Sequence, residues 1–279
     1  MQDLAGKTAF VTGGASGIGL ALGRAFAAAG MRVMLADVEA AALDAAVASF
    51  AGEGPEGRGA VRGVVCDVAD PDSLDGAAAA AFAAFGKVHV VCNNAGVGGG
   101  GGIDDISLAS WRWVLDVNLM GVLNGVRSFL PHLRGHGEGG HFVNTASMAG
   151  MLGRDLGFSA YTASKFAVVG MSEGLAGELK PLGIGVSVLC PAWVRTRITE
   201  SARNRPERYG TAAPADPANP IAARVAELVR TGVDPAFVAA NVLRAIRNDE
   251  LYVFTHPEFR DRLEARFTAI LAAFPKPAG

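Results

Sequence analysis

A tyrosine and a lysine stand four positions apart in the segment Tyr161-Thr162-Ala163-Ser164-Lys165. In a helix, this spacing places the two side chains on one face, one turn apart. A free tyrosine has a pKa of about 10, too high for an efficient base near neutral pH, and a neighbouring ammonium favours the phenolate. The pair therefore predicts that Tyr161 transfers protons and that Lys165 lowers its pKa. Alone the pattern is weak, because this pair also occurs on solvated helices.

Two further polar residues are candidates for the same chemistry. Ser147 follows a predicted strand at 141–145, so its hydroxyl can face the same crevice as Tyr161 and donate to a developing alkoxide. Asn118 lies inside a helix predicted over 111–130, where asparagine is a poor helix former. A backbone bond that opens the helix for a water is one reason for an asparagine there. The alternatives are a cap or turn role for Ser147 and a solvated or structural role for Asn118.

A turn rich in glycine lies between a strand predicted at 8–11 and a helix predicted at 18–29. Small residues let the backbone turn sharply and approach a pyrophosphate, and the free N–H groups of a helix N-terminus bind the anion. The turn lacks the Gly-Lys-Ser/Thr of a P-loop, which disfavours nucleotide hydrolysis. A glycine turn alone also occurs as a purely structural element. We predict that its residues Gly13, Ser16, Gly17, Ile18 and Gly19 bind a dinucleotide.

Asp37 ends a second predicted strand, about twenty residues after the glycines, where a carboxylate accepts hydrogen bonds from ribose hydroxyls and repels a 2′-phosphate. No arginine or lysine interrupts the glycine turn or directly follows Asp37. We therefore predict NAD rather than NADP as the cofactor. A cap for the helix that follows is the alternative role of Asp37.

Polar turns also follow the strands predicted at 61–66 and 88–92. Asp67 and Val68 follow the first strand, where adenine is expected, and Asn93-Asn94-Ala95-Gly96 follows the second. Amide side chains in such a turn hold the neighbouring backbone and can bond a ribose. We predict that Asp67, Val68, Asn93, Ala95 and Gly96 bind the cofactor, with a plain turn-forming role as the alternative.

Strands and helices alternate along the whole chain, with further strands predicted at 185–190 and 251–254 and a helix at 161–179. This alternation indicates parallel pairing with right-handed crossovers. We predict the α/β class: a single Rossmann-like doubly wound parallel sheet of about seven strands, with helices on both faces and a crevice at the carboxyl ends of the strands. We expect Pro131 to end the helix over 111–130. No linker divides the chain, so we predict one dinucleotide-binding domain over 1–279 with a substrate-lid insertion at about 196–235.

The overall composition disfavours several classes of protein. The net charge of −2 offers no electrostatic attraction to nucleic acid or to an anionic membrane. No uncharged apolar run reaches about 18 residues, and the first residues lack the pattern of a signal peptide. The three cysteines do not suggest a disulfide scaffold, and the five histidines form no metal-binding pattern. We therefore expect a cytoplasmic protein that binds no metal.

Taken together, these motifs resemble those of the short-chain dehydrogenase/reductase family. The matching features appear in the family's order and span about two-thirds of the chain. They are Thr12-Gly13-x-x-x-Gly17-x-Gly19, Asp37, Asp67, Asn93-Asn94-Ala95-Gly96, Asn118, Ser147, Tyr161-x-x-x-Lys165 and Pro191-x-x-Val194-x-Thr196. The chain departs from the pattern where Ala192 replaces the glycine usual after this proline and Trp193 follows.

The resemblance implies a role for each matching residue. Tyr161 would exchange a proton with the substrate oxygen that Ser147 positions, while hydride passes between the nicotinamide ring and the substrate carbon. Lys165 would bind the nicotinamide ribose and lower the pKa of Tyr161, and Asn118 would hold a water that links Lys165 to solvent. The cofactor residues that it adds are Tyr161, Lys165, Pro191, Val194 and Thr196, the last two at the nicotinamide carboxamide. The chain would thus be an NAD-dependent oxidoreductase acting on CH–OH groups.

The substrate pocket is expected at 148–158 and 193–232, in segments that are mostly apolar but contain Arg154, Arg195 and Arg197. The run from Glu200-Ser201-Ala202-Arg203 through Arg205-Pro206 to Tyr209-Gly210, with Leu251-Tyr252 and His256-Pro257-Glu258, resembles bacterial members of the family that oxidise benzylic alcohols of lignin aryl ethers at C-alpha. We therefore predict a bulky apolar secondary alcohol or its ketone, with aromatic compounds among the candidates.

The long helices predicted at 111–130 and 161–179 carry more small and apolar residues than one sheet face needs. The family resemblance implies that they pair across a twofold axis in a homodimer or homotetramer. Two rival functions are an NAD-binding redox sensor without activity and an epimerase or dehydratase on a related fold. The intact Ser147, Tyr161 and Lys165 disfavour the sensor, and the chain is short for the second rival.

Overall fold

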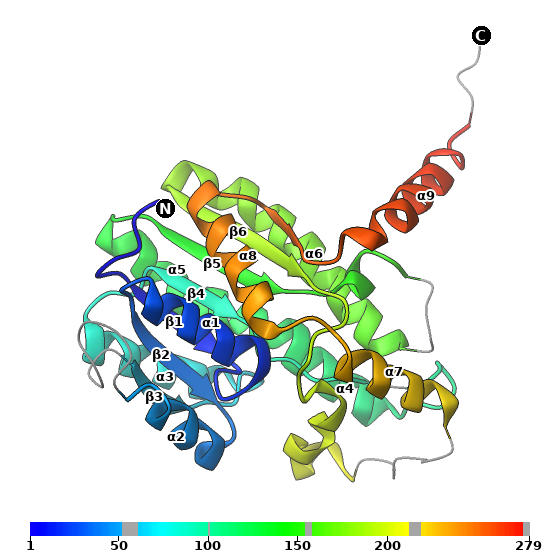
Figure 1. The fold of residues 1–279 in the computed structure, drawn as a ribbon, viewed down its shortest axis with the longest axis horizontal. Helices are drawn as coiled ribbons and strands as arrows, with labels where there is room; N and C mark the ends of the chain where they lie inside the picture. The colour runs from blue at the N-terminus through cyan, green and yellow to red at the C-terminus, as the bar shows by residue number, and fades with distance from the viewer. Residues whose placement is uncertain (52–60, 100, 154–157, 212–218, 276–279) are drawn as a thin grey trace.

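The computed structural model describes residues 1–51, 61–99, 101–153, 158–211 and 219–275 (Figure 1). Within these residues, seven strands form one sheet in the order β3-β2-β1-β4-β5-β6-β7, and each neighbouring pair is parallel. The strands are β1 (Thr8–Thr12), β2 (Arg32–Asp37), β3 (Val61–Val65), β4 (Val90–Asn93), β5 (Gly140–Thr145), β6 (Ile184–Cys190) and β7 (Tyr252–Phe254). The predicted Rossmann-like sheet is confirmed.

Helices cover both faces of this sheet, as expected for parallel strands joined by crossovers. Helices α1, α2 and α8 pack on one face, and α3, α5 and α6 pack on the other. The helices are α1 (Gly17–Ala28), α2 (Ala40–Ala48), α3 (Pro71–Phe85), α4 (Leu108–Leu115), α5 (Gly121–His136), α6 (Ser159–Leu179), α7 (Pro220–Arg230), α8 (Pro235–Asn248) and α9 (Arg260–Leu271). Among the described residues, no helix has the length and hydropathy needed to cross a membrane.

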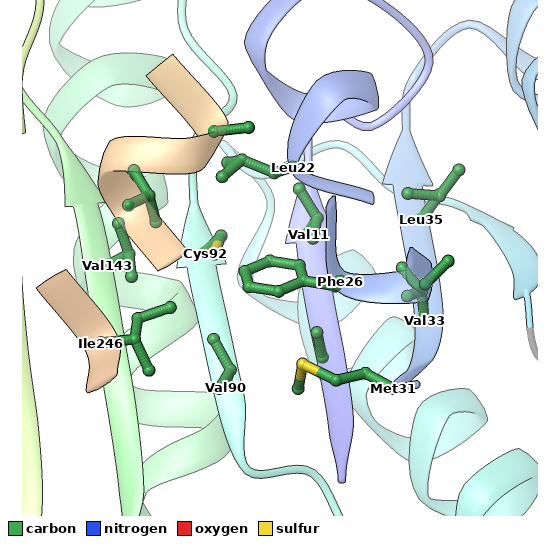
Figure 2. Packing of buried hydrophobic residues seen from close by; sticks show 14 of the residues in the cluster. Val11, Leu22, Phe26, Met31, Val33, Leu35, Val90, Cys92, Val143 and Ile246 are labelled. Carbon is green, nitrogen blue, oxygen red and sulfur yellow. The ribbon is translucent and has the colours of Figure 1, made fainter. Parts of the chain in front are cut away.

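The core beneath α1 and α8 shows why the sequence forms these layers. Phe26 of α1 and Ile246 of α8 are fully buried against the sheet, beside Val11, Val90 and Val143 (Figure 2). Burying each such side chain contributes about 1.5–3 kcal/mol. The continuous apolar runs of the central strands reflect burial on both faces. This packing fixes the carboxyl ends of the strands, from which the functional side chains extend.

The long helix predicted over 111–130 differs in two ways from the structure. It is divided into α4, a π-helical turn at Asp116–Met120, and α5. The expectation that Pro131 ends it is wrong, because α5 continues to His136 and ends at Gly137 in the left-handed conformation, with φ of 66°. A proline costs the helix one backbone hydrogen bond. Buried Phe129 and Leu133 lie on either side of Pro131, and their packing maintains the helix.

Candidate active site

A cavity of about 1610 Å³ lies at the carboxyl ends of the strands. It is lined by the turns after β1 to β6 and by the segment that follows β6. Fifteen of the predicted site residues line it: Gly13, Ser16, Gly17, Ile18, Asp37, Asp67, Val68, Ala95, Gly96, Ser147, Tyr161, Lys165, Pro191, Val194 and Thr196. Gly19, Asn93 and Asn118 are not among its lining residues. The structure thus brings together residues that are spread over most of the chain.

The glycine turn leads into a helix N-terminus that has no side-chain cap. Ser16 is the N-cap residue of α1 but makes no capping hydrogen bond, and the first turn of α1 holds no acidic residue. Gly17 has a φ of +54°, which favours glycine, and a Cβ at Gly19 would lie 2.0 Å from the Gly13 carbonyl oxygen. The small residues therefore let the turn fold tightly over free N–H groups. This local geometry fits a pyrophosphate.

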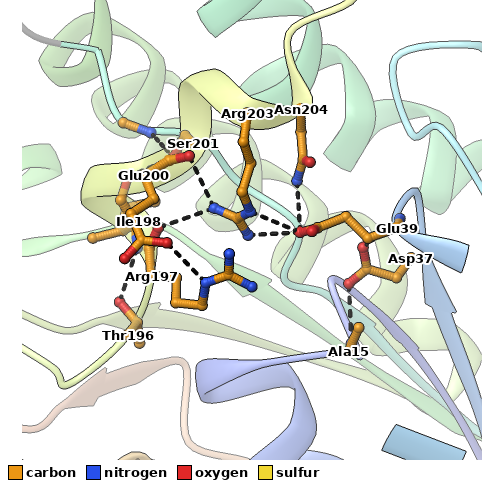
Figure 3. Close-up of polar contacts among 11 residues, drawn as sticks. Ala15, Asp37, Glu39, Thr196, Arg197, Ile198, Glu200, Ser201, Arg203 and Asn204 are labelled. Atoms are coloured by element: carbon orange, nitrogen blue, oxygen red, sulfur yellow. Dashed lines mark hydrogen bonds and ion pairs between the residues drawn. The ribbon is translucent and has the colours of Figure 1, made fainter. Parts of the chain in front are cut away.

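Asp37 fixes the chain on both sides of this turn. Its Oδ2 accepts a hydrogen bond from the Ala15 backbone N–H at 3.0 Å, and its Oδ1 accepts from the Glu39 N–H at 3.1 Å (Figure 3). The second contact is local, but it is not the helix cap considered as the alternative, because α2 begins at Ala40 and its N-cap residue is Glu39, with no side-chain cap bond. Each carboxylate oxygen has a second lone pair, so these contacts leave acceptor capacity toward the cavity.

Arginines from a distant segment reach the same end of the cavity, and the sequence interpretation missed them. Arg203 donates from Nε and Nη2 to Oε1 of Glu39, at 3.1 and 2.6 Å (Figure 3). Arg208 Nη2 donates to Oδ2 of Asp67 at 2.8 Å. The hydrogen bonds from Arg203 and Asn204 lower the pKa of Glu39. Glu39 and Arg203 are 164 positions apart, so the lack of basic residues next to Asp37 carried no information about this contact.

The two adjacent asparagines at the end of β4 lie in different environments. Asn94 lines the cavity, and its Nδ2 donates to the Thr12 carbonyl oxygen at 3.0 Å. Asn93 is buried and donates from Nδ2 to Asn144 Oδ1 at 2.9 Å, and a Cβ at Gly125 of α5 would lie only 1.9 Å from its Oδ1. The side chain of Asn93 therefore lies between the sheet and α5, outside the cavity to which the ribose contact was assigned.

Three of the predicted catalytic side chains meet in the cavity. The Tyr161 hydroxyl lies near the Ser147 side chain, which lowers the pKa of Tyr161. Ser147 Oγ also accepts from the Ala149 backbone N–H at 3.1 Å and donates to the Pro191 carbonyl oxygen at 3.3 Å. Lys165 Nζ lies 5.6 Å from the centre of the Tyr161 ring. These contacts position two hydroxyl groups and an ammonium together at one wall of the cavity.

No lowering of the Tyr161 pKa by Lys165 is resolved in this structure, so this role of Lys165 remains a prediction. Burial raises the pKa of Tyr161, and only the Ser147 side chain opposes this effect. The Lys165 ammonium donates to the Thr145 carbonyl oxygen at 2.8 Å and lies over the tyrosine ring instead of at its hydroxyl. Burial also lowers the pKa of Lys165 to about 8, because desolvation disfavours the ammonium.

Asn118 lies at the π-helical turn between α4 and α5. The Gly121 N–H donates to the Asp116 carbonyl oxygen, a bond that spans five residues in place of four. The helix is therefore widened at Asn118, whereas the role of Asn118 in holding a water remains a prediction. Asn118 approaches Lys165 across Gly96, where a Cβ would lie 3.3 Å from Asn118 Oδ1 and 3.6 Å from Lys165 Nζ.

The rest of the cavity wall contains several large apolar side chains. Met148, Leu152, Phe158, Trp113 and Trp193 line it. Of the other pocket candidates, Tyr209 does not line the cavity but donates its hydroxyl to Asp116 Oδ2 at 2.8 Å. Among the three candidate arginines, Arg197 lines the cavity, Arg195 forms an ion pair with Asp234 and Arg154 lies outside the described residues. The described wall can therefore accommodate a bulky apolar group.

Comparisons with known proteins agree with this geometry. A family model described as short chain dehydrogenase matches residues 7–207. The C alpha-dehydrogenase of Sphingobium sp. (strain NBRC 103272 / SYK-6) is 35% identical over 272 residues, which cover 97% of this chain and 87% of that protein. The 1-deoxy-11-beta-hydroxypentalenate dehydrogenase of Streptomyces arenae is 35% identical over 277 residues, which cover 97% and 90%.

A solved structure gives the same result for the fold. The short chain dehydrogenase/reductase of Burkholderia phymatum, solved in complex with NAD, superposes with a TM-score of 0.91 at 38% identity. The match covers 100% of this chain and 99% of that one. The Sphingobium relative also confirms the resemblance to C-alpha dehydrogenases that the sequence indicated. With both the motifs and the fold in agreement, the chain belongs to the short-chain dehydrogenase family.

Proposed function

We propose that the protein is an NAD-dependent oxidoreductase that interconverts a secondary alcohol and its ketone. The observation that carries the proposal is that Tyr161, Ser147 and Lys165 line one cavity, which also receives the uncapped N-terminus of α1. When bound, the nicotinamide accepts or donates the hydride. The protein therefore has to hold the substrate oxygen and exchange one proton with it.

Each catalytic side chain has one task in this proposal. Ser147 donates a hydrogen bond to the substrate oxygen, and Tyr161 takes the alcohol proton during oxidation and returns it during reduction. Lys165 binds the nicotinamide ribose and supplies positive charge near the phenol. Asn118 supports a water beside Lys165, through which that proton exchanges with solvent. Because burial alone raises the pKa of Tyr161, this nearby charge is needed for transfer near neutral pH.

We propose the cofactor site along the turns after β1 to β4 and after β6. The pyrophosphate lies on Gly13, Ser16, Gly17 and Ile18, and the adenosine lies between Asp37 and the pair Asp67–Val68. The nicotinamide end lies against Ala95, Gly96, Pro191, Val194 and Thr196. Asp37 lies at the ribose end, with Glu39 two residues further along the same cavity wall, and the Asp37 carboxylate would repel a 2′-phosphate. The NAD in the Burkholderia phymatum relative supports this preference.

For the substrate, we propose a bulky apolar secondary alcohol or its ketone, with aromatic alcohols among those to be tested. The apolar wall around Trp193 and the activities in the names of the two dehydrogenase relatives support this class. The insertion at 196–235 acts as the lid over that substrate within one dinucleotide-binding domain. A cytoplasmic location and assembly into a homodimer or homotetramer remain predictions.

The experiment follows the absorbance of the reduced nicotinamide with a panel of alcohols and ketones and both cofactors. We expect turnover with bulky apolar alcohols and NAD. Tyr161→Phe should reduce kcat by about 10²- to 10⁴-fold, the usual contribution of a general acid–base group, while NADH still binds. Tyr252→Phe is the matched control, because the exposed Tyr252 hydroxyl contacts Glu173 and does not line the cavity.

The possible outcomes separate the alternatives. Undiminished turnover by Tyr161→Phe would falsify the assigned proton transfer. A preference for NADP would contradict the role given to Asp37, and activity restricted to small polar polyols would contradict the substrate class. Tight NADH binding with no turnover on the whole panel would instead favour a redox sensor.

A further inference from the structure

The segment 198–210, which we call the strap, crosses one end of the cavity after β6. It contains two 3₁₀ helices, Ile198–Asn204 and Glu207–Tyr209. Two of its arginines contact carboxylates that follow β2 and β3, namely Glu39 and Asp67. These carboxylates belong to the proposed adenosine site. Figure 3 shows the first of these contacts, with Glu39 next to Asp37 and the strap helix across from both. The strap therefore joins two sides of the site that the cofactor must enter.

Arg203 is committed to holding the strap. Besides its two bonds to Glu39, its Nη1 donates to the carbonyl oxygens of Arg197 and Glu200, at 3.3 and 3.0 Å. Four of the five guanidinium N–H donors are therefore used within the protein. Asn204 Nδ2 adds a third bond to the same Glu39 oxygen, at 2.9 Å. This saturation favours a structural tie over the alternative role of Arg203 as a receptor for a cofactor phosphate.

The other end of the strap is tied to Asp67 and to α4. The hydrogen bond with Asp67 raises the pKa of Arg208, as expected for a charged pair. Arg205 lies 5.3 Å above the centre of the Trp113 ring and donates from Nη1 to Ser110 Oγ at 3.0 Å. The strap is thus attached at Glu39, at Asp67 and at α4, with the cavity between these attachments.

The two ion pairs that hold the strap are partly exposed to solvent. The side chains of Arg203 and Glu39 are 26% and 25% exposed, and those of Arg208 and Asp67 are 50% and 26% exposed. Ion pairs with such solvent access contribute little individually and are screened by salt. A closure based on them can therefore reverse during each catalytic cycle.

We propose that Arg203 and Arg208 are positioning residues that hold the strap over the adenosine half of the cofactor, so that NADH dissociates only after both ion pairs have opened. The inference rests on the proposed NAD site at Asp37 and Asp67. It assigns part of the lid insertion to cofactor retention, in addition to substrate enclosure. It also makes the dissociation rate of NADH depend on ionic strength.

The test measures the release of NADH from the full-length protein by its fluorescence in a stopped-flow instrument, with excess NAD as the displacing ligand. We expect Arg203→Gln, Glu39→Gln and Arg208→Gln each to release NADH about two- to fivefold faster than the wild type, as for loss of a partly exposed ion pair. The double variant Glu39→Gln/Arg203→Gln should be no faster than either single variant, because both remove one interaction. Added salt should accelerate release from the wild type more than from the variants.

Two controls separate the strap from general effects of charge and folding. Arg244→Gln removes an arginine from an exposed pair with Glu250 on the far side of α8, and it should release NADH like the wild type. The exchanged pair Glu39→Arg/Arg203→Glu should restore slower release than either of its single substitutions. This rescue would not occur if the single variants simply damaged the local fold.

The failure of this inference is distinguishable from failure of the proposed function. If the wild type binds NADH and the variants at positions 203 and 208 release it at the wild-type rate, the strap does not retain the cofactor, although the oxidoreductase proposal stands. If the wild type shows no saturable NADH binding, both proposals are overturned. Release that is faster in the Arg244→Gln control as well would also contradict the specific role of the strap.

Discussion

The side chain of Asn118 is bonded to both backbone polar groups of Val97. Asn118 Oδ1 accepts from the Val97 N–H at 2.8 Å, and Nδ2 donates to the Val97 carbonyl oxygen at 3.0 Å. The same Nδ2 also donates to Ser164 Oγ at 3.2 Å. One amide therefore connects the π-helical turn, the turn after β4 and α6, which are the three segments around Lys165.

Replacing Asn118 should cost both stability and activity. Asn118→Ala leaves the buried N–H and carbonyl groups of Val97 without their partner, and each unsatisfied buried group costs about 1–3 kcal/mol. We expect the free energy of unfolding to fall by about 2–4 kcal/mol in a urea titration. Turnover should fall more than the NADH affinity, because the altered turn carries the water proposed beside Lys165.

Asn124 provides the matched control for this variant. It is also a buried asparagine of the same helical region, but it makes a single bond, from Nδ2 to the Val68 carbonyl oxygen at 3.0 Å. Asn124→Ala should cost about 1 kcal/mol and leave kcat close to the wild-type value. Equal losses of activity in the two variants would show that Asn118 has no special role in catalysis.

The buried ammonium of Lys165 should give the protein a specific dependence of stability on pH. Burial lowers its pKa from the ordinary value of 10.5 to about 8 in the folded protein. Between these values the unfolded chain binds more protons than the folded one, so the free energy of unfolding contributed by Lys165 rises with pH. From pH 8 to about 10.5, the cofactor-free wild type should gain up to about 3 kcal/mol relative to Lys165→Met.

This gain is measured by urea unfolding of both proteins at several pH values. Below pH 8 the difference between them should be constant, because Lys165 is protonated in both states. The exposed Lys180 offers the control Lys180→Met, whose curve should run parallel to that of the wild type. A constant difference between wild type and Lys165→Met across the whole range would contradict a lowered pKa for Lys165.

Local patterns were sufficient to predict the sheet, the glycine turn and the pair Tyr161–Lys165, since each depends on residues that are near in sequence. The placement of Asn93 depends on one residue at the end of a strand. The sequence pattern ended β4 at Cys92, whereas the strand continues through Asn93. Alternate residues of a strand point to opposite faces, so Asn93 lies on the face of Val91, toward α5. Asn94, one residue later, lines the cavity.

The contacts of the strap could not be predicted in this way. Glu39 follows Asp37 by two positions and resembled the start of an ordinary helix, while Arg203 was part of a segment with no regular periodicity. Their proximity results from the crossover that returns the chain over the sheet after β6. The absence of arginine near Asp37 in the sequence therefore does not reveal which charges surround a site that is assembled from six turns.

The position of Asn93 leads to a test of the packing between α5 and the sheet. A methyl group at Gly125 would lie 1.9 Å from Asn93 Oδ1, and the bond to Asn144 prevents Asn93 from turning away freely. Gly125→Ala should therefore lower the free energy of unfolding by about 1–3 kcal/mol, as overpacking of a core does. Urea denaturation measures this change.

Gly76→Ala is the control, because a Cβ at Gly76 of α3 meets nothing within 4 Å, and it should stabilise the protein slightly. Equal behaviour of the two variants would contradict the close approach of Gly125 and Asn93.

The exposed face of α6 provides a test of the predicted assembly. Gly170, Gly174 and Gly177 lie on this face, and a Cβ at any of them meets nothing within 4 Å in the described chain. Each glycine costs an isolated helix about 1 kcal/mol relative to alanine, and close approach of a helix from a second copy would offset that cost. Light scattering of the wild type should give the mass of a homodimer or homotetramer, and Gly174→Arg should reduce that mass while the circular dichroism spectrum is retained. Gly76→Arg places the same side chain on α3 and should not change the mass. A monomeric wild type, or an unchanged mass for Gly174→Arg, would exclude this face of α6 as the contact between copies.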